Sequence, residues 1–396
     1  MPSAVFIPQS IRKKDKQLIG EIYKNGTGGV NDALLQRYAG GFDKAITSVF
    51  GADDEELQQR LRLNASRFGT YKAYEVSRKL EALRGLPGGE FEKEAEKLLN
   101  QYNGFQEAEY NTLKARSRST RQFLQFKQEA LIYPNIEWLH SRSANPREKH
   151  LQYVGIILPI DHPFWNDNQP GNEYNCKCDW RTTDKPATST PNSTIKPAPG
   201  FEGNPAATGE LVTDNHPYFK RNANAPKWVE EKAVLQAPDE VVFNKTETSA
   251  GSYLEHLLLH PGEAQGNREI VTILLENGYK NITLLPQLNR NEKTLRARYF
   301  GKEYAGKHPT SNPDAIIDSN IVEFKATGRR NLSVRIHESA IKSDIAVVKL
   351  KELLPDTYLD NFVARQWEMP DRKNLVEIII YNGGELKVYK RKKRNS

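Results

Sequence analysis

Apolar residues recur at intervals of three and four through much of the first third of the chain. This spacing covers residues 29–131 and is interrupted at 51–54 and 86–89, where turn residues coincide with acidic helix starts. Because an α-helix completes a turn in about 3.6 residues, such spacing gathers apolar side chains on one side of each helix. The pattern predicts an elongated body of helices, in which no grouping of residues indicates catalysis.

The pattern changes after Pro134. Apolar runs at residues 136–140 and 153–158 have the length and composition of strands, and a turn-rich stretch then continues to Cys178. We therefore expect residues 1–185 to form a mostly α-helical N-terminal domain with a small α+β end.

The density of apolar residues then falls. Residues 185–209 are mostly Pro, Thr, Ser, Asn, Ala and Gly, with almost no large apolar side chain. Such a segment buries too little surface to offset the entropy lost on ordering. Residues 210–244 are ambiguous, because they could fold onto either neighbour. We assign residues 186–244 to a partly disordered linker.

A compact alternation of elements resumes near residue 245. Helices are predicted at residues 250–259, 267–277, 334–342 and 356–366, and strands at 282–285, 315–317, 321–325, 345–350, 375–380 and 386–389. The last two strands flank an Asn-Gly-Gly turn, which is a strong hairpin signal. Strands interleaved with helices predict an α/β domain over residues 245–396.

The overall composition is that of an ordinary globular protein, with 37% hydrophobic and 27% charged residues. No stretch approaches the roughly 20 apolar residues of a membrane helix, so we expect no membrane partner. The N-terminus lacks the continuous apolar core of a signal peptide. We therefore expect synthesis in the cytoplasm and no export by the ordinary secretory route.

The formal net charge of +7 is compatible with a polyanionic partner. Most of the excess lies after residue 245, partly in the basic tail at residues 390–394. The tail could equally be a solvated chain end.

One short segment of the C-terminal domain has the pattern of a metal-dependent active site. Asp314 begins the first of two predicted strands, a turn follows at residues 318–320, and the second strand carries Glu323 and Lys325. Because side chains alternate along a strand, Glu323 and Lys325 share one face, and a tight hairpin brings Asp314 towards them.

These residue types suit phosphodiester hydrolysis. Two carboxylates on one rigid face can hold Mg²⁺, or Mn²⁺ or Zn²⁺, which would polarise a phosphate and activate a water. Lys325 could position that water and stabilise the charge of the transition state. The competing interpretation is an exposed hairpin with an incidental salt bridge between Lys325 and Asp318 or Glu323.

The segment Pro313-Asp314 with Glu323-Phe324-Lys325 resembles the PD-(D/E)xK nuclease superfamily. The wider pattern over residues 245–390 is similar to the tRNase domain at the C-terminus of contact-dependent inhibition toxins. It includes the helix that contains Asn267-Arg268-Glu269 and the strand at 282–286. The resemblance implies a metal-dependent endonuclease that acts on RNA, with tRNA as its substrate and an immunity protein as its partner. It also implies a further acidic metal ligand on the first helix, for which we choose Glu269, with Glu276 second.

Basic and aromatic residues accompany this motif. Candidate phosphate contacts are Arg296, Arg298, Lys302, Lys307, Arg329 and Arg330, and candidate base-stacking residues are Tyr299, Phe300 and Tyr304. A metal-independent ribonuclease could instead use two histidines as acid and base. The domain has four of them, His256, His260, His308 and His337, whose spacing favours no particular pair.

A second resemblance covers residues 1–185. The residues Arg147 and His150, Gly155, Phe164-Trp165, Pro170-Gly171 and Cys176-Lys177-Cys178 are similar to the end of the phage Mu F-like head morphogenesis (minor capsid) domain. That family more usually has Arg where this chain has Lys177. The resemblance implies phage head or portal proteins as partners and a place in the virion.

Together the two resemblances imply a phage-encoded toxin, made in the host cytoplasm, carried in the head and delivered into the cytoplasm of a recipient cell. Two alternatives stay open. One is a purely structural head protein with an inactive C-terminal domain, and the other is a DNA endonuclease.

Cys176 and Cys178 are the only cysteines of the chain, and one residue between them is too few for a comfortable disulfide. With His150 and His162 they could form a zinc site, although structural zinc pairs usually have two to four intervening residues. We therefore expect the cysteines to be small packing residues and the histidines to be hydrogen-bonded, and we regard structural zinc as the less favoured alternative.

Overall fold

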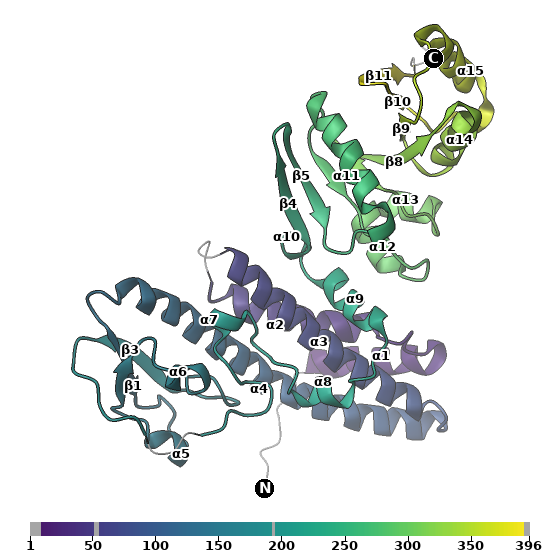
Figure 1. The fold of residues 1–396 in the computed structure, drawn as a ribbon. Coiled ribbons are helices and arrows are strands. Elements are labelled where there is room, and N and C mark those ends of the chain that lie inside the picture. Colours follow the sequence, from purple (N-terminus) through teal and green to yellow (C-terminus); the bar gives the residue numbers. More distant parts are fainter. Residues whose placement is uncertain (1–8, 51–54, 192–194, 392–396) are drawn as a thin grey trace. The chain divides into compact units, whose positions relative to one another are not determined.

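The computed structural model describes residues 9–50, 55–191 and 195–391, and it divides the chain into two compact units (Figure 1). The first unit is Met1–Val241 and the second is Val242–Ser396. The predicted turn at 51–54 and the basic tail beyond residue 391 lie outside the described residues. Among the described residues, none of the helices is long and apolar enough to cross a membrane.

Four long helices make up the body of the first unit, and the apolar spacing predicted the last three. They are α1 (Gln9–Asn25), α2 (Asp32–Thr47), α3 (Glu55–Leu83) and α4 (Gly88–Glu129). The side chain of Asn31 accepts hydrogen bonds from the first backbone N–H groups of α2, and α4 follows Pro87. Helix α1 precedes the predicted helical region and was missed.

A small antiparallel sheet follows α4. Strand β1 (Asn135–Leu139) lies between β2 (Ile157–Pro159) and β3 (Asp179–Thr183). Two single-turn helices, α5 (Glu148–Leu151) and α6 (Phe164–Asp167), lie in the connections. The core of this region is largely aromatic, with contributions from α4 and all three strands. The predicted small α+β end is therefore confirmed, although the strand expected at 153–158 is a turn up to Gly155.

The predicted linker is wrong for most of its length. Helices α7 (Pro205–Thr208), α8 (Pro217–Arg221), α9 (Lys227–Gln236) and α10 (Asp239–Val242) lie in this segment. Phe201, Leu211 and Val212 are fully buried in the same core as α2 and α3.

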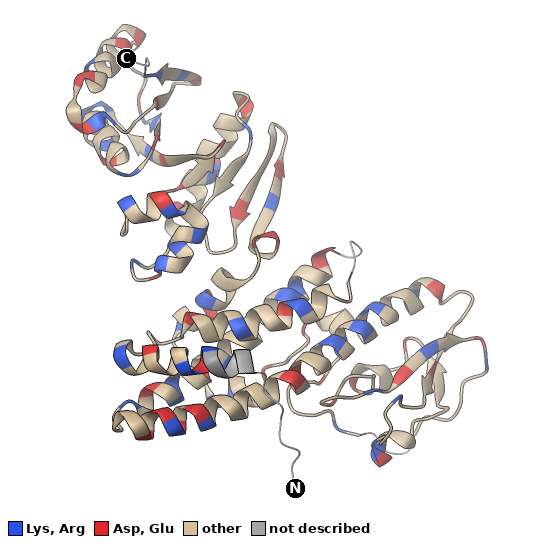
Figure 2. Cartoon of the chain, turned by 180° about the vertical axis from the view of Figure 1, so that it is seen from behind, with Lys and Arg blue, Asp and Glu red and all other residues tan. Residues whose placement is uncertain are grey.

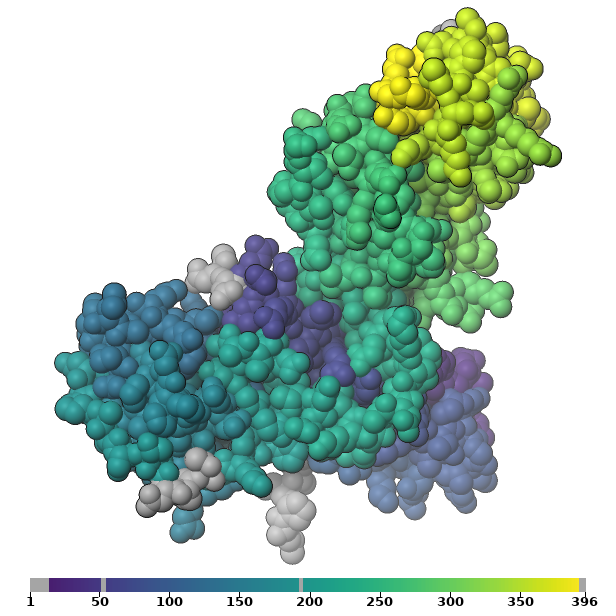
Figure 3. Space-filling model, viewed as in Figure 1, coloured from purple at the N-terminus to yellow at the C-terminus, as the bar shows by residue number. Residues whose placement is uncertain are grey.

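Remote hydrogen bonds hold this segment in place. The side chain of Asn64, in α3, accepts from the backbone N–H groups of Leu211 and Val212 and donates to the carbonyl of Val212. In Figure 3 the teal surface of the segment covers part of the purple and blue helical body. A few well-placed apolar residues thus anchor a chain whose average composition is that of a linker.

The second unit is built on a sheet of eight strands in the order β11-β10-β9-β8-β7-β6-β5-β4. The strands are β4 (Phe243–Thr248), β5 (Gly251–His256), β6 (Ile282–Leu284), β7 (Ala315–Ile317), β8 (Asn320–Thr327), β9 (Ile345–Leu350), β10 (Glu377–Asn382) and β11 (Glu385–Lys390). The helices are α11 (Pro261–Glu276), α12 (Lys293–Phe300), α13 (Lys302–Lys307), α14 (Leu332–Lys342) and α15 (Asp356–Glu368).

The α/β character of this unit is confirmed, but one expected helix is wrong, and β4, α12 and α13 were missed. The helix expected at 250–259 is strand β5, which pairs antiparallel with β4. The spacing of its apolar residues fits both a helix and a strand, and the hydrogen-bonded pairing with β4 stabilises the strand.

Opposite faces of the sheet carry different helices. Val322, Phe324 and Val347 share a buried cluster with Ile270 and Leu274 of α11. Ala346 and Val348 belong instead to the cluster that contains Leu332 and Ile336 of α14. Neighbouring residues of one strand therefore face different helices, as the alternation of a strand requires.

The buried position of Phe201 gives a direct test of the corrected boundary. We expect Phe201→Ala to lower the free energy of unfolding by about 3–5 kcal/mol, because it leaves a cavity in the helical core. Ser189→Ala, at an exposed position of the same expected linker, should change it by less than about 0.5 kcal/mol. Urea unfolding followed by circular dichroism measures both, and equal stabilities would contradict the docked segment.

Candidate functional site

Asp314 and Glu323 lie opposite each other on one face of the sheet. Asp314 directly precedes β7, and the pairing of Ala315 with Val322 in β8 sets the register. The N–H of Asp314 donates to the carbonyl of Val322 at 3.2 Å, and the N–H of Phe324 donates to Oδ2 of Asp314 at 2.7 Å. The predicted hairpin therefore brings the two carboxyl groups together.

Lys325 completes the expected trio on the same face. Glu323 and Lys325 are in register with Ala346 and Val348 of β9, which belong to the α14 side. Glu323 is fully buried, and Nζ of Lys325 donates to its Oε2 at 2.6 Å.

Lys342 is a fourth member that sequence reasoning missed. It is the last residue of α14, and its Nζ lies 2.8 Å from Oε1 of Glu323. The contact is an ion pair without the angles of a hydrogen bond, so Oε1 accepts no hydrogen bond from any described residue. The amphipathic pattern of α14 was visible, but nothing local marked Lys342 as a partner of Glu323.

The electrostatics of the site reflect two crowded carboxyl groups. Burial and the adjacent Glu323 carboxylate raise the pKa of Asp314 to about 7, although the Phe324 N–H and the ammonium groups of Lys325 and Lys342 oppose this. Burial alone would lower the pKa of Lys325, but the charges of Glu323 and Asp314 outweigh it and raise that pKa.

A divalent cation suits this arrangement. It would relieve the repulsion between the two carboxylates, and at Oε1 of Glu323 it would compete with the Lys342 ammonium group, which forms an ion pair there but no hydrogen bond. Asp314 and Glu323 are the residues that could hold it.

A pocket of about 650 Å³ opens on the same side of the hairpin. Ile316 and Ile321 line it, and Ile316 follows Asp314 by two residues along β7. Tyr304 links pocket and site, because it lines the pocket and its hydroxyl donates to the carbonyl of Lys342 at 2.7 Å. Burial and then the Glu323 carboxylate raise the pKa of Tyr304.

The predicted ligand Glu269 does not join the site. It lies on α11, the helix that covers the other face of the sheet, and it is exposed. Its carboxylate forms an ion pair with Lys349 at 2.8 Å. Glu276, the second choice, is exposed at the end of the same helix. A helix was expected correctly here, but the face that it covers follows from packing.

The candidate phosphate-binding residues fall into three groups. Arg298, Lys302 and Lys307 are exposed and line the pocket. Arg329 and Arg330 are exposed beyond the end of β8, and the Arg329 guanidinium lies 4.4 Å from the centre of the Tyr358 ring. Figure 2 shows that basic and acidic residues are interspersed over both units. The three basic residues that line the pocket are therefore a local grouping.

Arg296 forms the third group, because it is buried and its guanidinium is used internally. It donates to the side chain of Asn312 at 2.8 Å and to the carbonyl of His308 at 3.1 Å. It therefore organises the loop before β7 and is not available to a phosphate. Tyr299 and Phe300 are also buried, which leaves Tyr304 as the half-exposed aromatic residue of the three.

The histidines give little support to a metal-independent mechanism. His256 is buried, its Nε2 lies 3.2 Å from the hydroxyl of Tyr299, and burial lowers its pKa to about 3. Nδ1 of His337 lies 2.9 Å from Oδ2 of Asp371. His308 lines the pocket beside Tyr304, and burial lowers its pKa.

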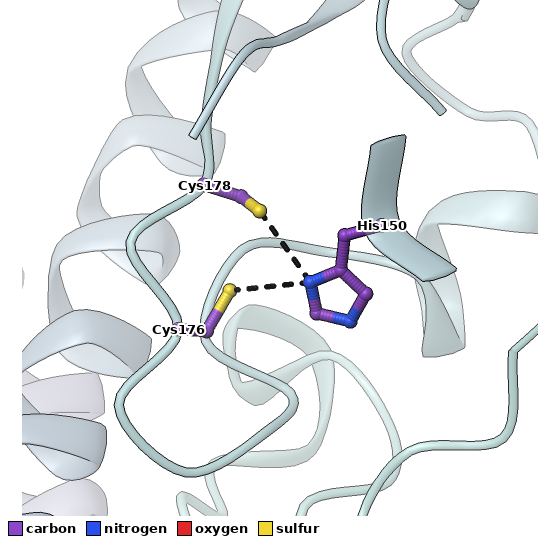
Figure 4. A group of neighbouring side chains, drawn as sticks. All are labelled: His150, Cys176 and Cys178. Atoms are coloured by element: carbon purple, nitrogen blue, oxygen red, sulfur yellow. Dashed lines mark hydrogen bonds between the residues drawn. The ribbon is translucent and has the colours of Figure 1, made fainter. Parts of the chain in front are cut away.

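A separate cluster lies in the first unit, where His150, Cys176 and Cys178 converge (Figure 4). Both cysteines are free, and the hydrogen bond from Cys178 lowers the pKa of Cys176. His162 is not a member, because its Nδ1 accepts from the N–H of Phe164 at 3.1 Å and its Nε2 lies 3.4 Å from the hydroxyl of Thr190.

No protein-family model, curated protein or solved structure matches this chain. Function is therefore inferred from the geometry and chemistry of the residues described above.

The pKa of Asp314 is expected to move in opposite directions in two variants. Glu323→Gln removes a charge that raises this pKa, so it should fall below about 7. Lys342→Ala removes a charge that lowers it, so it should rise. NMR titration of the aspartate carboxyl carbons measures both, with Lys349→Ala on the opposite face as the unchanged control. Shifts of the same sign would contradict this placement of the charges.

The same pKa has a consequence for stability. The folded-state pKa of Asp314 lies above its ordinary value of 3.8, so the unfolded chain loses this proton first as the pH rises. The contribution of Asp314 to the free energy of unfolding should therefore fall between about pH 4 and pH 7. Asp314→Asn should remove that part of the pH dependence in urea unfolding, and an unchanged profile would count against the raised pKa.

Proposed function

We propose that the unit Val242–Ser396 is a metal-dependent nuclease that hydrolyses phosphodiester bonds. One observation carries the proposal: Asp314, Glu323 and Lys325 share one face of the sheet, with Lys325 Nζ 2.6 Å from the buried Glu323 carboxylate. Acidic groups that can hold a cation, next to a fixed ammonium group, are a combination that suits metal-dependent phosphodiester hydrolysis.

Asp314 and Glu323 would hold Mg²⁺, or Mn²⁺ or Zn²⁺ in its place. When bound, such an ion supplies Lewis-acid polarisation of the phosphate and lowers the pKa of a coordinated water. Lys325 is then the group that orients the attacking water and offsets negative charge on the phosphate. Lys342 holds the second oxygen of Glu323 from α14 and so positions that carboxylate.

The neighbouring pocket supports a polyanionic substrate. Arg298, Lys302 and Lys307 line it, so substrate phosphates that enter the pocket would have cations to contact. Tyr304, at the junction of pocket and site, offers a ring on which a base could stack. The preference for RNA, and for tRNA in particular, rests on the sequence resemblance to toxin domains. A DNA endonuclease is the alternative.

The role of the first unit is a further part of the proposal. Its sequence resemblance to Mu F-like proteins supports attachment to a phage head, with the nuclease delivered to a recipient cell and held in check by an immunity protein. A purely structural head protein with an inactive second unit is the competing proposal, and it predicts no cleavage of any nucleic acid.

Substitution of the trio should abolish catalysis and leave the fold intact. We expect Asp314→Ala and Lys325→Ala each to lower Mg²⁺-dependent cleavage by about 100-fold or more, since each removes a group that acts in the transition state. Lys349→Ala is the matched control, because it removes an ammonium group from the opposite face of the adjacent strand. Cleavage rates of the full-length chain on tRNA, with circular dichroism of each variant, provide the measurement.

The same assay separates the alternatives. Loss of cleavage with EDTA supports the metal-dependent mechanism, and parallel incubation with plasmid DNA decides the substrate. Glu269→Ala should retain activity, because that residue lies on the other face. Undiminished cleavage in both trio variants would refute the assignment, and a wild-type chain inactive on both nucleic acids would favour the structural alternative.

A further inference from the structure

We infer that His150, Cys176 and Cys178 form a zinc-binding site in the first unit. The site is separate from the proposed nuclease centre and does not depend on it. Sequence reasoning treated these cysteines as small packing residues, because a single intervening residue is short for a zinc pair. The arrangement of their side chains carries the new assignment.

The three potential ligand atoms are spaced as tetrahedral coordination requires. The Sγ atoms of Cys178 and Cys176 lie 3.4 Å and 3.8 Å from Nδ1 of His150, and all three atoms lie within 4.8 Å of one another. Zinc bonds of about 2.3 Å to sulfur and about 2.0–2.1 Å to nitrogen, at tetrahedral angles, place sulfur and nitrogen about 3.5 Å apart. The two observed separations bracket this value.

Hydrogen bonding alone accounts poorly for this convergence. Nδ1 of a neutral imidazole has either one proton or one lone pair, so it forms one full hydrogen bond and not two. Figure 4 shows both sulfur atoms directed at this single nitrogen. A cation between the three atoms would satisfy all of them.

The local backbone explains how so short a spacing works. Asn175, immediately before Cys176, has a left-handed conformation with φ of 55°, which turns the chain into the cluster. Cys176 is buried and Cys178 is half-buried, whereas Lys177 between them is exposed. The two thiols therefore face inwards from one turn, and His150 meets them from α5.

A metal ion would stabilise the surrounding fold by crosslinking its loops. The strands of the sheet β2-β1-β3 have three, five and five residues in that order, and long connections join them. A metal bridge between α5 and the segment before β3 would tie two of these connections together, as structural zinc does in small domains. Two thiolates and Zn²⁺ also cancel in charge, which suits a largely buried position.

The fourth coordination position is open to an external ligand. Among the described residues, the cluster has three His, Cys, Asp or Glu side chains. Cys176 and Cys178 also line a pocket of about 430 Å³ that Arg118 and Arg142 border. A water or a small anion from this pocket would complete the tetrahedron.

Metal analysis of the full-length chain tests the site. The protein is purified under reducing conditions with any polyhistidine tag removed, exposed to Zn²⁺, dialysed and measured by plasma mass spectrometry. We expect about one Zn²⁺ per chain, and Co²⁺ in its place should give the thiolate charge-transfer and visible bands of a tetrahedral site. Asp314→Ala, which removes a ligand of the proposed nuclease centre, should still bind this thiolate-held ion, so failure of the nuclease proposal would not affect this result.

Variants identify the ligands. Cys176→Ser, Cys178→Ser and His150→Asn should each lose the metal and the charge-transfer band, whereas His162→Asn should keep both. If a variant fails to fold, the wild-type chain still decides: bound Zn²⁺ should slow alkylation of both cysteines at least tenfold, and a chelator should reverse this.

Three results would overturn the inference. The first is a wild-type chain that lacks stoichiometric Zn²⁺ and whose thiols react equally fast with and without the ion. The second is a Cys176–Cys178 disulfide found by mass spectrometry of the purified protein. The third is loss of the metal in His162→Asn.

Discussion

The antiparallel pairing of β7 with β8 is the constraint on which the second unit's proposed chemistry depends. This register places Asp314 opposite Glu323, and the bond from the Phe324 N–H to Oδ2 of Asp314 holds the pair in place. Because side chains alternate, a slip of one residue would turn Glu323 into the apolar face under α11 and bring Phe324 to the charged side. Asp318 and Ser319, both with positive φ, form the tight turn that sets the register.

The same pairing imposes an energetic cost. Glu323 is fully buried beside a second carboxyl group, an arrangement that is unfavourable unless cations compensate. Lys325 from the same strand and Lys342 from α14 provide this compensation. Burial, and then the Glu323 carboxylate, nevertheless raise the pKa of Asp314. A site in which two acidic groups repel each other is suited to bind a cation. The apolar clusters on both faces of the sheet offset the unfavourable contribution of this site to the free energy of folding.

In the first unit, a segment with few apolar residues is ordered because those residues pack into a core that the long helices already form. Phe201, Leu211 and Val212 occupy a core built by the long helices, so the segment that contains them is ordered despite its composition. Long loops join the strands of the small sheet beyond α4. The convergence of His150 with the two cysteines lies in those loops, where an additional crosslink contributes most.

The sequence by itself determined the features that depend on near neighbours. Helical spacing identified α2, α3, α4 and α14, and strand alternation placed Glu323 and Lys325 on one face with Asp314 close by, because such relations span only a few residues. Only the tertiary structure decided that α11 carries Glu269 to the opposite face and that α14 brings Lys342 to Glu323. It also decided that Arg296 is buried and that His150, rather than His162, lies beside the cysteines. Each of these depends on which distant segments pack together, and packing selects among many placements that local periodicity leaves equally open.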